Sequence, residues 1–90
     1  KLIPKRPDLD FARYALGVAY FKNNDFVNAE KWFRAAIDQD PKNVVYYMAL
    51  GNALISRKDG KGLKALIDRI RPIDAAAADE LDKKRIAFRM

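Results

Sequence analysis

The chain has 90 residues, with 18 lysines and arginines against 12 acidic residues, a net charge of +6, and neither cysteine nor histidine. This length allows one domain with a small core, and the composition excludes disulfides, thiolate catalysis and nearly every kind of zinc site. No apolar run approaches the length of a membrane span, and the N-terminus lacks the order of a signal peptide. The compartment stays open between the cytoplasm and the bacterial cell envelope.

The first predicted helix ends at Lys22. We expect Asp8 or Asp10 to cap it, because an aspartate oxygen accepts hydrogen bonds from the free N–H groups of the opening turn. Apolar residues occupy two of its faces, so we expect the helix to be packed between neighbours on both sides. One face holds Phe11, Tyr14, Ala15, Val18 and Phe21, and the other holds Leu16, Ala19 and Tyr20.

A tight turn at Asn23–Asp25 separates this helix from a second one over about Phe26–Asp38. Pro41 ends the second helix, since the residue before a proline is pushed out of helical geometry. The lone tryptophan, Trp32, lies beside the apolar stripe of this helix. We interpret it as packed against a neighbour or half exposed on the outer surface, rather than as part of a ligand site.

The second half of the chain follows the same order of elements. Asn43 is expected to cap a third helix over Val44–Ser56, and residues 57–60 form a second turn. A fourth helix ends before Pro72, and its apolar positions recur at helical spacing. These positions are Leu63, Leu66, Ile67 and Ile70.

The last helix begins after the predicted cap Asp74 and is more polar than the others. Lys84 and Arg85 interrupt its apolar side, which suits a helix that covers one neighbour and presents its other face to water. We therefore expect it to cap the array or to begin a degenerate third repeat. The residues available for burial are Ala78, Leu81, Ile86 and Phe88.

An internal repeat of 34 residues joins these elements. Leu16-Gly17 recurs as Leu50-Gly51, and Pro7 recurs as Pro41. Glycine is unfavourable in the interior of a helix. Its recurrence at the same position therefore indicates that two helices approach each other closely there. A 34-residue helix–turn–helix period resembles the tetratricopeptide repeat family. The residues that carry the resemblance are Leu16, Gly17, Tyr20, Ala29, Phe33, Ala36 and Pro41.

The resemblance implies an all-α fold of two antiparallel helix pairs in a right-handed superhelical stack, followed by a capping helix. Residues 1–9 would be the tail of a preceding repeat or a linker, 10–43 the first repeat, 44–74 the second, and 75–90 the capping helix or a degenerate third repeat. Since the sequence begins at Lys1, we expect it to be part of a longer repeat protein.

In the resembled family, the first helix of each repeat lines a concave groove that receives a peptide or helix of another protein. This implies a protein–protein interaction module, acting as an adaptor or scaffold, with self-association as an alternative use of the groove. Repeats that bind the acidic C-terminal tails of chaperones use a lysine and an asparagine at the positions that Tyr14 and Val18 occupy in this chain. Only Asn52 matches that pattern, so an acidic chaperone tail is a poor candidate ligand. Carried over by position, the groove is mostly apolar and is lined by Phe11, Tyr14, Val18, Phe21, Lys22, Val45, Met48, Asn52, Ile55 and Ser56.

We do not expect an enzyme, a cofactor or a metal site. Most carboxylates stand at turns and helix caps, and those structural roles are sufficient to explain their presence. The alternative function is binding of nucleic acid or an anionic membrane or polymer through the basic C-terminal half, which we disfavour. The basic residues there are Lys58, Lys61, Lys64, Arg69, Arg71, Lys83, Lys84, Arg85 and Arg89.

Overall fold

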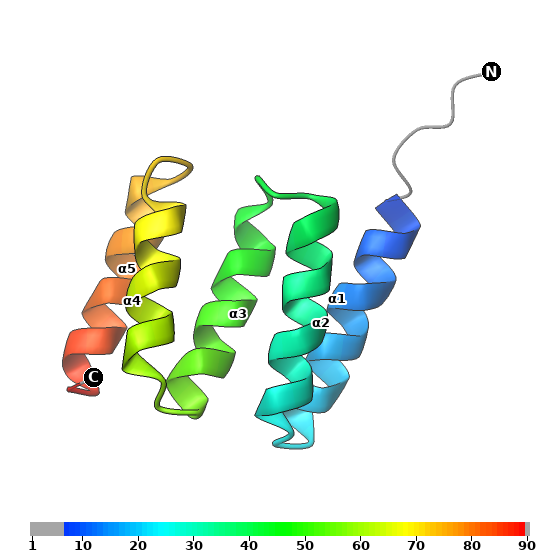
Figure 1. The fold of residues 1–90 in the computed structure, drawn as a ribbon, viewed down its shortest axis with the longest axis horizontal. Helices are drawn as coiled ribbons and strands as arrows, with labels where there is room; N and C mark the ends of the chain where they lie inside the picture. The colour runs from blue at the N-terminus through cyan, green and yellow to red at the C-terminus, as the bar shows by residue number, and fades with distance from the viewer. Residues whose placement is uncertain (1–6, 90) are drawn as a thin grey trace.

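The computed structural model describes residues 7–89, with side chains from residue 11 onward. Within these residues the chain forms α-helices joined by turns, so the predicted all-α fold is confirmed (Figure 1). Residues 1–9 were expected to be the tail of a preceding repeat or a linker; residues 1–6 lie outside the described residues, and residues 7–9 belong to the first helix. The helices are α1 (Pro7–Lys22), α2 (Phe26–Gln39), α3 (Val44–Ser56), α4 (Gly60–Ile70) and α5 (Ala75–Ala87).

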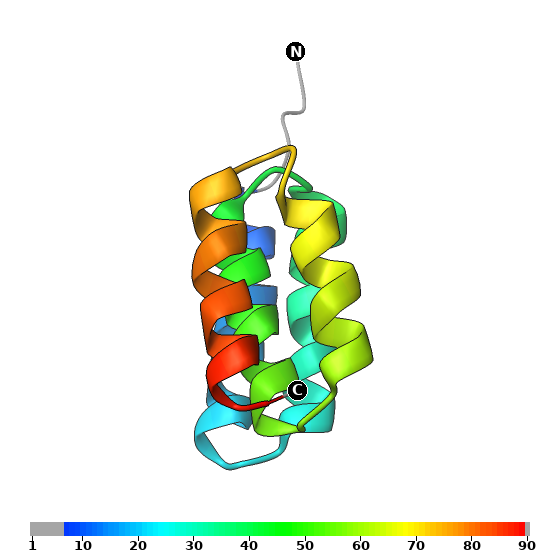
Figure 2. The ribbon, with the colours of Figure 1, turned by 90° about the vertical axis from the view of Figure 1, so that its left-hand side faces the viewer.

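The helices are arranged in two layers. Figure 2 shows α1, α3 and α5 in one layer and α2 and α4 in the other. Each helix packs against the next one in the chain, and α1–α3 and α3–α5 contacts join neighbours within the first layer. The central helix α3 therefore contacts all four other helices, which explains why it is the most apolar of the five.

Short polar side chains set where most helices begin. The Oδ1 atom of Asn43 accepts a hydrogen bond from the N–H of Val45 at 3.0 Å, and Asp74 Oδ1 accepts one from the N–H of Ala77 at 3.1 Å. Both caps were predicted, and both are confirmed. The cap prediction for the first helix is wrong, because α1 begins at Pro7 and contains Asp8 and Asp10. Proline is favoured at the first helical position, where its fixed φ suits the helix and its missing N–H is not needed.

The core lies between the two layers and runs through all helices except α1, whose side chains pack on it from one side. Tyr47 is buried, and its hydroxyl donates a hydrogen bond of 2.6 Å to the carbonyl oxygen of Pro41. The buried hydrophobic side chains are Ala29, Phe33, Ala36, Ile37, Tyr46, Tyr47, Leu50, Ala53, Leu54, Leu63, Leu66, Ile67, Ile70, Ala77, Ala78 and Leu81.

The two repeated glycines lie at close helix–helix contacts, as the sequence predicts. A Cβ atom on Gly17 would lie 2.5 Å from two ring carbons of Phe33 in α2, and one on Gly51 would lie 2.7 Å from a methyl of Leu81 in α5. Both distances are below ordinary contact distances between carbon atoms, which are about 3.5–4.0 Å. A side chain at either position would therefore push the helices apart.

Burial differs from expectation at both ends of the stack. The α1 face with Leu16 was expected to be covered, yet Leu16 is 43% exposed. In α5, Ala78 and Leu81 are buried as expected, whereas Ile86, and Phe88 just after the helix, are 62% and 64% exposed. The last buried residue of α5 is Leu81, which shows that only the first half of this helix faces the core.

Candidate functional site

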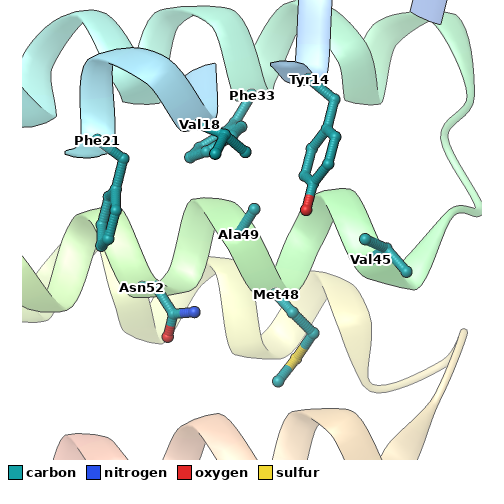
Figure 3. Close-up of a pocket in the computed structure, with 8 residues that line it drawn as sticks. All are labelled: Tyr14, Val18, Phe21, Phe33, Val45, Met48, Ala49 and Asn52. Carbon is teal, nitrogen blue, oxygen red and sulfur yellow. The ribbon is translucent and has the colours of Figure 1, made fainter. Parts of the chain in front are cut away.

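A pocket of about 250 Å³ lies between α1 and α3, with Phe33 of α2 behind it (Figure 3). Its wall on the α1 side is made of apolar and aromatic side chains, and its wall on the α3 side adds one amide. The lining residues are Tyr14, Val18, Phe21, Phe33, Val45, Met48, Ala49 and Asn52. The pocket is therefore apolar over most of its surface.

Helical spacing brings these side chains together. Tyr14, Val18 and Phe21 follow one another at intervals of four and three residues on α1, which places them on one side of the helix. On α3, Met48 and Asn52 are four residues apart. Figure 3 shows Phe21 and Asn52 at one end of the pocket, and Tyr14 and Met48 toward the other.

The aromatic wall is firmly supported from behind. The Tyr14 ring lies 5.8 Å from the Phe33 ring and 5.3 Å from the Tyr46 ring, both measured between centroids, and Phe33 and Tyr46 are buried. Aromatic pairs at such distances add stability beyond the area that they bury. Tyr14 is thus a structural residue as well as a lining residue, so replacing it would affect both stability and the pocket.

The polar edge of the pocket involves a third helix. Lys84 of α5 donates a hydrogen bond from its Nζ atom to Oδ1 of Asn52, with a distance of 3.4 Å. The exposed amide is therefore held beside a cation at the rim. Together these groups could orient a polar or acidic atom of a ligand whose apolar side chain enters the pocket.

The structure distributes the predicted groove residues over two hollows. Six of them line the pocket: Tyr14, Val18, Phe21, Val45, Met48 and Asn52. Ile55 and Ser56 line a second hollow of about 550 Å³ beyond the end of α3, together with Lys58, Phe88 and Arg89. Phe11, which is 62% exposed, and Lys22 line neither hollow.

Residues 11–43 match the family model of the tetratricopeptide repeat. This segment is assigned to the tetratricopeptide repeat family. The matched residues cover α1, α2 and the turn into α3, so the predicted family is confirmed on the hairpin that carries its motif. No curated protein and no solved structure matches the chain. Tetratricopeptide repeats generally mediate protein–protein interaction and typically belong to scaffolds rather than enzymes.

Three residues at the site were not among the predicted groove residues. Phe33 was assigned to the repeat motif and the core, and it serves both the core and the back of the pocket. Ala49 could have been found, because it stands 34 residues after Ala15, which was placed on the groove side of the first helix. Nothing in the local sequence signals Lys84, since its contact with Asn52 spans 32 residues.

Two of the basic residues of the C-terminal half, Arg71 and Arg69, have partners on the protein surface. Arg71 pairs with Asp79 at 2.8 Å, and this hydrogen bond is the main cause that raises the pKa of Arg71. The guanidinium carbon of Arg69 lies 5.4 Å from the centre of the Tyr47 ring. These two arginines contact neighbouring side chains of the chain itself. Their presence is therefore explained by packing, without a role in binding nucleic acid.

Three further observations concern metal binding, membrane insertion and Trp32. Within residues 7–89 there is no group of three or more acidic, histidine or cysteine side chains placed to hold a metal ion. No helix in that same part of the chain is long and apolar enough to cross a membrane. The half-buried Trp32 has the Nζ atom of Lys31 5.9 Å from its ring centre and lines neither hollow.

Proposed function

We propose that this chain binds a segment of another protein in the pocket between α1 and α3, and so acts as an adaptor or scaffold. The observation that supports this most is the pocket itself, in which equivalent positions of two repeat helices present side chains, most of them apolar, to one opening. Tyr14 corresponds to Met48, and Val18 to Asn52, each 34 residues apart. A mostly apolar lining with a few polar groups is typical of sites that bind a protein segment or another ligand.

The size of the pocket limits what it can receive. Its volume of about 250 Å³ is below the roughly 300–1,000 Å³ of pockets that enclose a whole drug-sized ligand. We therefore propose that one or two apolar side chains of the partner enter it, while the rest of the segment lies along α3. Stable interfaces bury about 800 Å² on each partner, so we expect this chain alone to bind at micromolar affinity or weaker.

We also propose a division of the chain that follows its repeat. Residues 10–43 form the first repeat and residues 44–74 the second, because α3 and α4 follow one another in the same order as α1 and α2 and also pack on each other. Residues 75–90 act as a capping helix, supported by the burial of Ala77, Ala78 and Leu81 against the second repeat. Residues 1–9 precede the first repeat.

The test is a selection of phage-displayed random peptides on the 90-residue chain, followed by fluorescence anisotropy with a selected peptide. We expect Met48→Glu to weaken binding about tenfold or more, because it places a charge in an apolar pocket. The matched control is Val27→Glu, since Val27 is an exposed apolar residue on α2 that does not line the pocket. This control should change affinity less than about twofold.

Circular dichroism of both variants checks that the helices are retained, and light scattering checks that peptide binding is not measured on a dimer of the chain. The proposal is wrong if no apolar peptide is selected. It is also wrong if Val27→Glu and Met48→Glu weaken binding equally, because the binding surface would then lie outside the pocket.

A further inference from the structure

One backbone position recurs at the end of each helix in the first layer. Asn24, Lys58 and Arg89 have φ angles of 63°, 60° and 58°, in the left-handed region. They follow α1, α3 and α5 at intervals of 34 and 31 residues. Each donates its backbone N–H to the carbonyl three residues earlier, at 3.0 Å in all three cases. The fold therefore places an equivalent residue at the same end of each helix.

The identity of the residue at this position carries information. Left-handed geometry favours glycine and asparagine, since other side chains crowd the backbone there. Asn24 follows that preference, whereas Lys58 and Arg89 do not. A basic residue near a helix C-terminus interacts favourably with the helix dipole, but Asn24 shows that the position does not require one.

The two cations converge on the second hollow. It has a volume of about 550 Å³ and is lined by Ile55, Ser56, Lys58, Phe88 and Arg89. Within the described part of the chain, neither Lys58 nor Arg89 forms an ion pair. The Phe88 ring is exposed beside them. The helix dipole alone does not account for an exposed ring and two uncompensated charges around one hollow.

Helix α3 connects this hollow to the apolar pocket. Met48 and Asn52 line the pocket, and Ile55 and Ser56, one turn further along the same helix, line the hollow. Lys84 lies beside Asn52 at the boundary, so cations continue along this edge. Figure 1 shows that α3 and α5 end on the same side of the molecule, and residues at these two helix ends line the hollow. The pocket and the hollow therefore follow one another along α3, and we call the two together the groove, with an apolar end at the pocket and a basic end at the hollow.

We propose that the basic end of this groove binds an aspartate or glutamate side chain of the partner segment whose apolar side chain enters the pocket. This inference rests on the proposed function and assigns a charge and a direction to the ligand. Carboxylate oxygens accept charge-assisted hydrogen bonds from ammonium and guanidinium groups. From Met48 to Ser56 the helix rises about 12 Å. The acidic residue should therefore stand about two turns from the apolar anchor in a helical partner, or about four residues from it in an extended one.

The experiment repeats the peptide selection on the wild-type chain and on the double variant Lys58→Asn, Arg89→Asn. Asparagine tolerates left-handed geometry, so both substitutions remove charge without straining the backbone. The control variant, Lys61→Asn, Lys64→Asn, removes the same charge from exposed positions on α4 that line neither hollow. We expect the wild type and the control to select peptides with an acidic residue at the stated spacing. The double variant should select the apolar anchor alone.

Affinities of one selected peptide and its acid-to-amide copy give the quantitative result. For the wild type, we expect the amide copy to bind about three- to tenfold more weakly, since two exposed charge pairs are lost. For the double variant the two peptides should bind equally. If the wild type selects apolar peptides without an acidic preference, this inference is wrong and the proposed function stands. If Met48→Glu leaves all peptide binding intact, both are wrong.

Two other occupants would also overturn the inference. If a fluorescent oligothymidine binds the wild type more tightly than the peptide does, and binds the double variant more weakly than the wild type, Lys58 and Arg89 bind phosphate instead. A dimer detected by light scattering, and weakened by the double variant but not by the control, would show that a second copy of the chain fills the basic end.

Discussion

Gly51 and Leu81 offer a direct test of how closely α5 packs on α3. A Cβ atom on Gly51 would lie 2.7 Å from Cδ2 of Leu81 and 2.9 Å from its Cδ1. Ordinary carbon–carbon contacts are about 3.5–4.0 Å, and the Leu81 side chain has no exposed surface into which it can move. The Gly51→Ala substitution should therefore displace the leucine methyl groups or α5 itself.

The size of the effect follows from two opposing terms. Overpacking of a core contact costs about 1–3 kcal/mol, while alanine in a helix interior is favoured over glycine by about 0.8–1.0 kcal/mol. Gly51→Ala should thus lower the free energy of unfolding by about 0–2 kcal/mol. Leu81→Ala removes every atom in the clash, so in that background Gly51→Ala should raise the free energy of unfolding by about 1 kcal/mol.

The assay is urea denaturation of four proteins, followed by far-ultraviolet circular dichroism: the wild type, each single variant and the double variant. Leu81→Ala alone should lower the free energy of unfolding by about 2–5 kcal/mol. The coupling between the two substitutions should be about 1–3 kcal/mol. If Gly51→Ala has the same effect in both backgrounds, within about 0.5 kcal/mol, α5 does not press on Gly51 and the packing argument is refuted.

Two further substitutions test other contacts by the same denaturation assay. Gly17→Ala should destabilise the chain more than Gly51→Ala does, by up to about 3 kcal/mol, because the Phe33 ring at 2.5 Å is rigid where a leucine side chain can turn; a neutral effect would contradict this contact. Tyr47→Phe should lower the free energy of unfolding by about 1 kcal/mol, since it removes the hydrogen bond of 2.6 Å to the Pro41 carbonyl. An unchanged midpoint would mean that this bond adds no net stability.

Local signals predicted the helix boundaries well where they acted alone. Asn43 caps α3 and Asp74 caps α5 as expected, because a side-chain oxygen satisfies the free N–H groups of the first turn wherever the helix later packs. The first helix was misjudged because two signals competed. Pro7 starts α1, so Asp8 and Asp10, which would each have been good caps, fall inside it.

Burial and the site were harder to predict, because they depend on what lies opposite each face. Phe88 is apolar and directly follows a helix that packs on the core, yet it is exposed, since the buried positions of α5 end at Leu81. Spacing along α1 and α3 identified the faces that form the pocket, as with Met48 and Asn52. The contribution of Lys84 depends on the distance between α3 and α5 in the folded chain, which no local pattern contains.

Comparing equivalent positions of the two helix pairs separates stacking surfaces from open ones. Leu50 and Ala53 on α3 are buried, whereas their equivalents Leu16 and Ala19 on α1 are exposed. That face is covered in the second pair because the first pair packs on it. Helix stacking therefore explains why the face is apolar.

The groove positions behave differently, because they stay open in both pairs. Phe11 and Val45 are both exposed, and Tyr14 and Met48 are both half-buried. No helix among the described residues covers Phe11 or Val45, and Tyr14 and Met48 keep part of their surface open, although the same stack buries Leu50. An apolar surface that repeats along a stack without being used for stacking needs another reason, and a ligand that lies across α1 and α3 supplies one.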